Sequence, residues 1–407
     1  MDDTNSLQHG AADAALPVRD PNLGFLTLWI ITLLAVVAVV GAINAVVDPF
    51  LVTGAPRIKG FNAKKPEIET HGQLGKDYLV ARVKPQGVYL GSSKVDLGLD
   101  PASPNWPADA RPAFNYGVPG NDLRQMDVNL RRALAVGPVR RALVLVDIED
   151  IMAAKPAAPE APLTRTPWQS LEDWTLALLS TDSLRGSIAT VAGQRSKDIS
   201  DSSPLGQMSD TRYRSRSRDL GADSIFIEKD FGLNQALADM KTGLKAQPQA
   251  GYAGLDDLAD IIRVARDKGV ALDIVIAPFH ADYLEMLRQN GLWDRYKGAK
   301  GALTQLVADQ GGGQARLWDF LGFDAYSTEA VPQGKGAETQ WFWEPSHFKG
   351  PLGEKILAVI YHGDTGYGVQ LTPQTLAPRL AADDQAAQAY EPTDAAFKDR
   401  MARAQRQ

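Results

Sequence analysis

Two stretches of the chain decide its fold: residues 142–148 read ALVLVDI, and residues 271–277 read ALDIVIA. Both are nearly continuous apolar runs of strand length, which is typical of parallel strands that helices cover on both faces. Shorter apolar runs at residues 87–90 (GVYL), 113–116 (AFNY) and 315–320 (ARLWDF) predict three more strands. The pattern therefore predicts an α/β fold.

Amphipathic segments alternate with these runs. Leu255, Leu258 and Ile262 recur at helical spacing, and Gly269 ends that segment just before the run at 271–277. This β-α-β rhythm predicts a three-layer, flavodoxin-like parallel sheet. Because crossover connections are right-handed, the carboxyl ends of the strands should share one edge of the sheet, where functional sites are usually built.

Composition excludes several classes of protein. With 407 residues, 44% of them hydrophobic and 23% charged, the chain matches an ordinary globular protein. Its net charge of −6 offers no overall basic field, so we expect no nucleic-acid partner. The absence of cysteine excludes disulfides, thiolate metal sites and cysteine nucleophiles. Neither His71 nor His362 lies in a grouped ligand motif, so we expect no metal and no cofactor.

One segment near the start of the chain predicts a membrane anchor. Residues 23–47 contain no charged side chain, and as a helix they would span about 37 Å, more than the ~30 Å hydrocarbon layer of a bilayer. The alternative is a cleaved signal peptide, whose apolar core is only about 7 to 15 residues long. We expect a transmembrane helix at 23–47, a disordered tail at 1–22, and a linker and entry segment at 48–85.

The charges around this segment leave its orientation open. Only Arg19 precedes it, whereas four basic residues follow soon after it: Arg57, Lys59, Lys64 and Lys65. The positive-inside rule would then place the large domain in the cytoplasm, but long domains translocate largely regardless of charge. On the functional grounds given below, we expect a single-pass protein of the inner (cytoplasmic) membrane with a periplasmic, extracytoplasmic domain.

The α/β domain should cover residues 86–360, with a mostly helical insertion at about 155–225. A basic cluster in that insertion is interleaved with acidic residues and consists of Arg212, Arg214, Arg216 and Arg218. We favour a solvated loop there, with contact to an anionic lipid or glycan as the alternative. Residues 361–407 carry no strand pattern and are expected to form a C-terminal arm that ends in a short helix.

Three motifs carry candidate chemistry. The first, Gly91-Ser92-Ser93, follows the first predicted strand, where a serine hydroxyl can act as a nucleophile. The second, NYGVPGND at residues 115–122, follows the second strand, and its glycines let a backbone N–H approach a ligand closely. The third is WEPSH at residues 343–347, in which a carboxylate lies three residues before a histidine. Taken singly, each is also compatible with a turn, a helix cap or a structural histidine.

In order and spacing, the three motifs resemble the SGNH (GDSL-like) hydrolase superfamily over residues 86–360. The resemblance implies that Ser93 is the nucleophile and that His347 is the general base. It also implies that Glu344 orients His347 in place of the usual aspartate, and that the backbone N–H groups of Ser93 and Gly120 bind the oxyanion. No cofactor is implied.

One block departs from the family pattern. Where the family commonly has G-x-N-D, this chain has Asp147-Ile148-Glu149-Asp150, and an ionised carboxylate cannot donate a hydrogen bond to an oxyanion. Loss of one such donor typically costs about 10² to 10³ in rate. The layout of anchor and motifs resembles the membrane-anchored subset that contains the D-alanyl transfer protein and the alginate-type O-acetylation proteins, which also diverge from the standard blocks.

This resemblance implies a serine esterase or O-acyltransferase acting on acyl (acetyl) esters of cell-envelope or exported polysaccharide. The alternative is a catalytically weak adaptor or binding protein that serves a membrane acyltransferase partner. Four residues near the motifs are weaker candidates for lining the substrate: Asn115, Asn121, His280 and Trp343. A structural role remains the alternative for His280, and packing remains the alternative to sugar stacking for Trp343.

Overall fold

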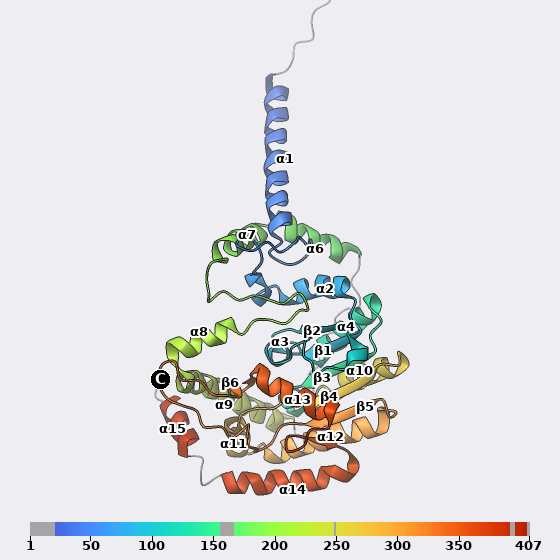
Figure 1. The fold of residues 1–407 in the computed structure, drawn as a ribbon, viewed down its shortest axis with the longest axis vertical. Coiled ribbons are helices and arrows are strands. Elements are labelled where there is room, and N and C mark those ends of the chain that lie inside the picture. The colour runs from blue at the N-terminus through green and yellow to red at the C-terminus, as the bar shows by residue number, and fades with distance from the viewer. Residues whose placement is uncertain (1–20, 155–166, 248–249, 391–394, 405–407) are drawn as a thin grey trace, which may run out of the picture.

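The computed structural model describes residues 21–154, 167–247, 250–390 and 395–404. Residues 1–20 of the tail expected at 1–22, and residues 155–166 at the start of the expected insertion, lie outside the described residues. The last two residues of that tail, Pro21 and Asn22, belong to the N-terminal helix. The described chain forms a helix that projects from a mixed α/β domain (Figure 1).

The core of the domain is a six-stranded sheet in the order β2-β1-β3-β4-β5-β8. The first five strands are parallel to one another: β1 (Gly87–Gly91), β2 (Ala113–Gly117), β3 (Arg141–Val146), β4 (Ala271–Ile276) and β5 (Ala315–Asp319). These are the five strands that the apolar runs predict, and their side chains are almost all buried. The prediction of an α/β fold with a largely parallel sheet is confirmed.

Helices cover both faces of the sheet. On one face, α4 (Leu123–Val136), α10 (Leu255–Asp267) and α12 (Trp293–Gln310) are the crossovers that lead to β3, β4 and β5, and they pack against one another in that order. On the other face, α13 (Gly350–His362) packs against α3 (Ser93–Gly98). Smaller elements complete the domain: η1 (Pro66–Glu69), α2 (Gly72–Val83), η2 (Ala108–Ala110), α5 (Ile148–Met152), α11 (Ala281–Gln289), β6 (Phe342–Glu344) and β7 (His347–Phe348).

The C-terminal segment has more structure than its sequence predicts. β8 (Val369–Leu371) pairs antiparallel with β5, and α14 (Pro373–Tyr390) and α15 (Ala395–Ala404) follow it. The expectation of no strand beyond residue 361 is therefore wrong. β8 has only three residues, too few for its alternation to be recognised.

Between β3 and β4 the chain forms four further helices: α6 (Pro167–Leu179), α7 (Thr181–Gly193), α8 (Thr211–Leu220) and α9 (Ala222–Ala246). The basic cluster, which we expected in a loop, lies on α8. Acidic partners neutralise its arginines, because Arg214 pairs with Asp210 at 2.7 Å and Arg216 with Glu228 at 2.6 Å. Glu228 lies on the next helix, so this support is not visible in the local sequence.

The N-terminal helix α1 (Pro21–Val47) extends away from the domain (Figure 1). Within the described residues it is the one helix long and apolar enough to cross a membrane, and most of its side chains are exposed.

Candidate active site

The first motif lies where β1 turns into α3. A side chain at Gly91 would collide with Val95, so the turn needs glycine there. Ser92 caps α3 and donates a hydrogen bond from Oγ to Asp147 Oδ2 at 2.8 Å. Ser92 thus has a structural role, whereas the side chain of Ser93, the first residue of the helix, is directed towards the third motif.

Ser93 and His347 lie in hydrogen-bond contact although 254 residues separate them. Ser93 Oγ is 2.6 Å from His347 Nε2, and the other ring nitrogen, Nδ1, bonds to Glu344 Oε1. Glu344 and His347 are held by the β6–β7 hairpin, in which they face each other across a turn that contains Pro345. The structure therefore brings together the three residues to which the sequence gives catalytic roles, in the order serine, histidine, carboxylate.

The surroundings of Glu344 keep it ionised. Burial alone would raise its pKa, but the charge of His347 and its hydrogen bond outweigh burial and lower the pKa to about 2. Ser346 adds a backbone N–H bond at 2.9 Å and a hydroxyl bond at 2.9 Å to the same carboxylate. A carboxylate held in this way fixes the orientation of the imidazole and can stabilise its protonated form.

The carboxylate that replaces the family's asparagine has a buried cation. Lys94 Nζ lies 2.8 Å from Asp147 Oδ1 and 4.2 Å from the centroid of the Phe279 ring. Burial would lower the pKa of Lys94, but the charges of Asp147 and Glu149 outweigh it and raise the pKa. Asp147 is therefore part of an ion pair beside the nucleophile. Sequence reasoning missed Lys94, although it directly follows Ser93.

A second buried ion pair supports the other side of α3. Lys76 Nζ on α2 lies 2.6 Å from Asp96 Oδ1 and also donates to the carbonyl of Gly117 at the end of β2. Asp96 Oδ1 accepts the backbone N–H of Met208 at 2.9 Å. These contacts tie α2, α3, β2 and the segment before α8 together. They limit the movement of the short helix that carries Ser93.

A pocket of about 250 Å³ opens over Ser93 and His347. Its other lining residues are Glu69, Leu97, Pro119, Met208, Arg212, Tyr213 and Arg216. A larger and more polar groove of about 630 Å³ shares Leu97 and Met208 with it, so the two hollows adjoin. Trp343 lines this groove. The centroid of its ring lies 5.8 Å from that of Tyr213 and 4.1 Å from Lys349 Nζ.

The other expected site residues lie elsewhere or at the margin. Asn115 does not line the pocket, because its buried amide donates to the carbonyls of Val95 at 2.7 Å and Leu99 at 2.8 Å. Asn121 bonds to Gln73 at 3.4 Å. Gly120 has a φ of +78° in the exposed turn next to Pro119, which lines the pocket.

His280 is buried and lines a different hollow. Its ring nitrogen Nε2 lies 2.9 Å from the carbonyl of Glu329, and its backbone N–H donates to the carbonyl of Pro345 at 2.9 Å. His280 therefore has the structural role that the sequence left open as the alternative, because it supports the turn that holds Glu344 and His347.

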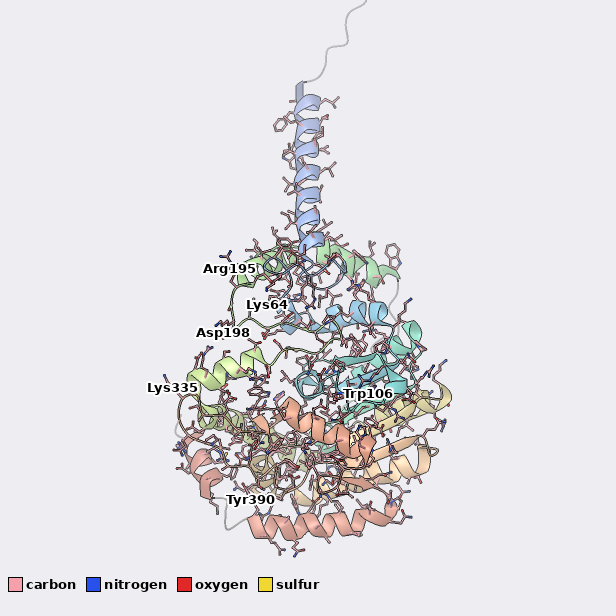
Figure 2. All side chains as sticks on the ribbon, in the orientation of Figure 1. Lys64, Trp106, Arg195, Asp198, Lys335 and Tyr390 are labelled. Atoms are coloured by element: carbon pink, nitrogen blue, oxygen red, sulfur yellow. The ribbon has the colours of Figure 1, made fainter. Side chains whose placement is uncertain are left out.

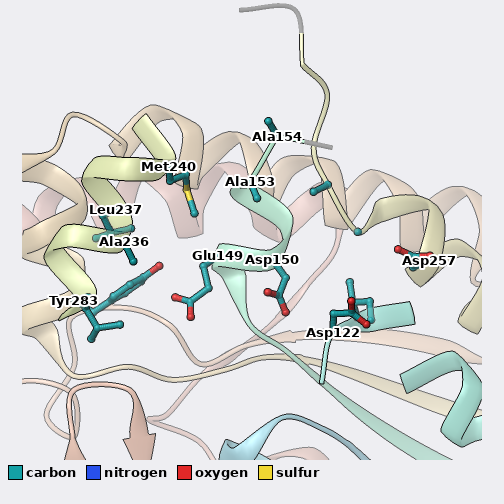
Figure 3. A pocket seen from close by; sticks show the side chains of 14 residues that line it. Asp122, Glu149, Asp150, Ala153, Ala154, Ala236, Leu237, Met240, Asp257 and Tyr283 are labelled. Atoms are coloured by element: carbon teal, nitrogen blue, oxygen red, sulfur yellow. The ribbon is translucent and has the colours of Figure 1, made fainter. Parts of the chain in front are cut away.

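A further hollow, of about 570 Å³, lies beyond the end of β3 (Figure 3). Its polar lining comes from Asp122, Glu149, Asp150, Asp257 and Tyr283, and neither Ser93 nor His347 reaches it. Figure 3 shows Glu149 and Asp150 side by side in this hollow. In the part of the chain that the structure describes, no group of three or more acidic or histidine side chains is arranged to hold a metal ion.

The fold and the site define a class: a mostly parallel α/β protein with a serine–histidine–glutamate arrangement at the carboxyl edge of its sheet. No protein-family model and no curated protein matches the chain. It is similar to a solved structure from Streptococcus pneumonia, assigned provisionally as a platelet activating factor. That match has 15% identity, a TM-score of 0.32, and covers 72% of this chain and 90% of the other. At this level of similarity, the match says nothing about the substrate.

Proposed function

We propose that this protein is an SGNH-type serine esterase or O-acyltransferase that acts on acyl (acetyl) esters of cell-envelope or exported polysaccharide. One observation carries the proposal. Ser93 Oγ lies 2.6 Å from His347 Nε2 while Glu344 bonds to the opposite ring nitrogen. This is the arrangement that activates a hydroxyl nucleophile.

The reaction takes two steps. Ser93 Oγ attacks the ester carbonyl while His347 Nε2 takes its proton. The bond between the carbonyl carbon and the leaving oxygen then breaks, and His347 returns the proton to that oxygen. A water molecule or a sugar hydroxyl next attacks the acyl-serine and gives its proton to His347. The acyl group leaves with the attacking oxygen, and the proton returns to Ser93.

In this mechanism the oxyanion is bound by the backbone N–H groups of Ser93 and Gly120. Asp147 does not take part as a donor, because it pairs with Lys94 and accepts a hydrogen bond from Ser92. The Lys94–Asp147 pair instead fixes the turn that carries Ser93.

The groove next to the pocket supports a polysaccharide substrate. Its lining is rich in polar side chains, including Gln207, Asp210 and Arg214, and it contains the indole of Trp343. Hydrogen-bonding groups of this kind suit the hydroxyl edges of sugar rings. Trp343 itself is only 3% exposed, because Tyr213 and Lys349 pack against its indole.

The proposal includes a location. α1 would anchor the chain in the inner (cytoplasmic) membrane as a single pass, with the domain in the periplasm, where exported glycans are found. A phosphatase fused after residue 60 should then be active. An inactive fusion would place the domain in the cytoplasm and remove the polysaccharide substrate.

A second candidate function is that of a catalytically weak adaptor for a membrane acyltransferase. The observation that favours it is Asp147, an ionised acceptor where the related family has a donor to the oxyanion.

The substitution Ser93→Ala separates the two candidates. We expect the full-length protein in detergent to hydrolyse p-nitrophenyl acetate, and Ser93→Ala to lower kcat by at least about 10³-fold. Ser224→Ala is the matched control, since Ser224 is an exposed serine in the first turn of α9. Equal rates for Ser93→Ala and the wild type would remove Ser93 from the mechanism and leave the adaptor.

A further inference from the structure

Helices α6 and α7 lie across the domain end of α1 (Figure 1). Asn44 on α1 joins both of them, because its Nδ2 donates to the carbonyl of Leu178 at 2.8 Å and its Oδ1 accepts the hydroxyl of Ser187 at 2.8 Å. The side chain of Leu179, at the end of α6, packs against Gly41. The pair, called here the α6–α7 platform (residues 167–193), is therefore fixed to the membrane-proximal end of the domain.

The polarity of α7 is the reverse of that of an ordinary surface helix. Its buried side is formed by small and hydroxyl residues, among them Ser183, Ser187 and Thr190. Its exposed side carries Ile188, which is 62% exposed, and Val191, which is 40% exposed. A helix that turns its apolar side outwards places that side against something other than water.

The same reversal holds for α6. Asp173 faces the domain and accepts a hydrogen bond from Tyr78 at 3.3 Å, and Ala177 is buried beside it. The opposite side carries Trp168 and Leu171, which are 75% and 56% exposed. Because α6 and α7 contact each other and α1, both exposed apolar sides lie at the domain end of α1.

The length of α1 indicates at which depth of a bilayer the α6–α7 platform would lie. The helix has 27 residues, which corresponds to about 40 Å, whereas the hydrocarbon layer is about 30 Å thick. About 20 residues cross that layer, so a span that begins near Leu23 ends near Ala42. The platform contacts α1 at Gly41 and Asn44, where the helix would leave the hydrocarbon for the headgroups.

We propose that the α6–α7 platform lies in the lipid interface of the same bilayer that α1 crosses, with its apolar side among the upper acyl chains. This inference rests on the anchoring role of α1 but not on catalysis. Tryptophan is enriched at this depth, and amphipathic helices that lie flat there bury their apolar side about 5 to 10 Å deep. Two exposed arginines, Arg185 within α7 and Arg195 just after it, would then face anionic headgroups. Figure 2 shows Arg195 beside α7.

The platform would hold the domain in one orientation rather than on a free tether. α2 lies directly beneath it, and Lys76 of α2 is one of the groups that fix α3. The catalytic pocket would then keep a constant height above the membrane surface.

Single cysteines test the inference directly, because the chain has none of its own. The full-length protein carries Leu171→Cys or Ile188→Cys, is labelled with an environment-sensitive fluorophore and is reconstituted into phosphatidylglycerol–phosphatidylcholine vesicles. Leu34→Cys on α1 reports the span. Leu220→Cys, at the end of α8 and 45% exposed, is the matched control outside the platform.

Spin-labelled lipids carry the quencher either near the headgroup or deep in the acyl chain. The shallow quencher should remove most of the emission of the labels at 171 and 188, and the deep quencher should remove that of the label at 34. The label at 220 should keep its emission with both. Quenching at 34 without quenching at 171 and 188 would overturn the platform and leave the anchor. Absence of quenching at all four positions would overturn the anchor as well. Labels at 171 and 188 that are shielded from water but not quenched would show that a protein covers the surface, which also contradicts the inference. None of these outcomes depends on esterase activity.

Discussion

Asp147 and Asp150 follow the end of β3 three residues apart, but their side chains lie in different surroundings. Asp147 faces the nucleophile, where it pairs with Lys94 at 2.8 Å and accepts the hydroxyl of Ser92 at 2.8 Å. Asp150 lines the hollow of Figure 3, where burial and then the charges of Asp147 and Glu149 raise its pKa to about 7. The same residue type thus lies in an ion pair on one side and has a raised pKa on the other.

The comparison of Asp147 with Asp150 shows on which side of the end of β3 carboxylates lie beside positively charged partners. On the nucleophile side, Asp147 pairs with Lys94, and, against the effect of burial, His347 lowers the pKa of Glu344. Burial nevertheless outweighs Lys76 and raises the pKa of Asp96. On the other side, Glu149 also has a raised pKa, because burial outweighs the attraction of Lys94. Charges are therefore held in fixed positions at the site, as a preorganised site requires.

The largest expected effect comes from removing the charge of Glu344. Glu344→Gln keeps the size of the side chain but no longer stabilises a protonated His347, so kcat for p-nitrophenyl acetate should fall by about 10² to 10⁴. That loss corresponds to about 3 to 5 kcal/mol in the activation free energy.

The matched control is Glu344→Asp, which keeps the charge and should retain more activity than Glu344→Gln. If Glu344→Gln has the wild-type kcat, the carboxylate does not orient His347, and catalysis does not depend on a charged partner for the histidine.

The next effect concerns stability. Lys94→Met leaves Asp147 buried without a cation, and breaking a buried pair in this way should lower the free energy of unfolding by about 3 to 5 kcal/mol. Urea denaturation in detergent, followed by tryptophan fluorescence, measures it.

The double variant Lys94→Met with Asp147→Asn removes both charges and should regain much of the lost stability. Equal destabilisation by the single and the double variant would show that the pairing contributes little. The contrast between Asp147 and Asp150 would then rest on burial alone.

Much of the fold could be predicted because its signals are local. β3 and β4 are apolar runs that a reader of the sequence recognises without knowing their partners. Ser93 and His347 could be proposed as a pair because their motifs resemble those of a known hydrolase superfamily in order and spacing. Ser93 follows the end of β1, whereas His347 lies in the separate β6–β7 hairpin.

The rest depended on contacts between distant segments. The sequence around Lys94 does not predict its ion pair with Asp147, which lies 53 positions later in the chain. Asn115 was misassigned because its motif gives no indication that its amide turns inwards to the carbonyls of α3. The outward apolar sides of α6 and α7 likewise have meaning only once the helices lie beside α1.

The smallest effect is a dependence of stability on pH that Asp150 controls. Its pKa of about 7 in the folded protein lies above the ordinary value of 3.8, so the folded state binds this proton more tightly than the unfolded state. The stability from this group is therefore complete below about pH 4, falls as pH rises towards 7, and is constant above that. Asp150→Asn should remove the decline, so that between pH 4.5 and pH 8 the variant gains about 1 to 3 kcal/mol in unfolding free energy relative to the wild type. Asp364→Asn, at an exposed position, should leave the decline unchanged. If Asp150→Asn also leaves it unchanged, the acid is ionised in the folded protein, and the two sides of the end of β3 differ less than their partners imply.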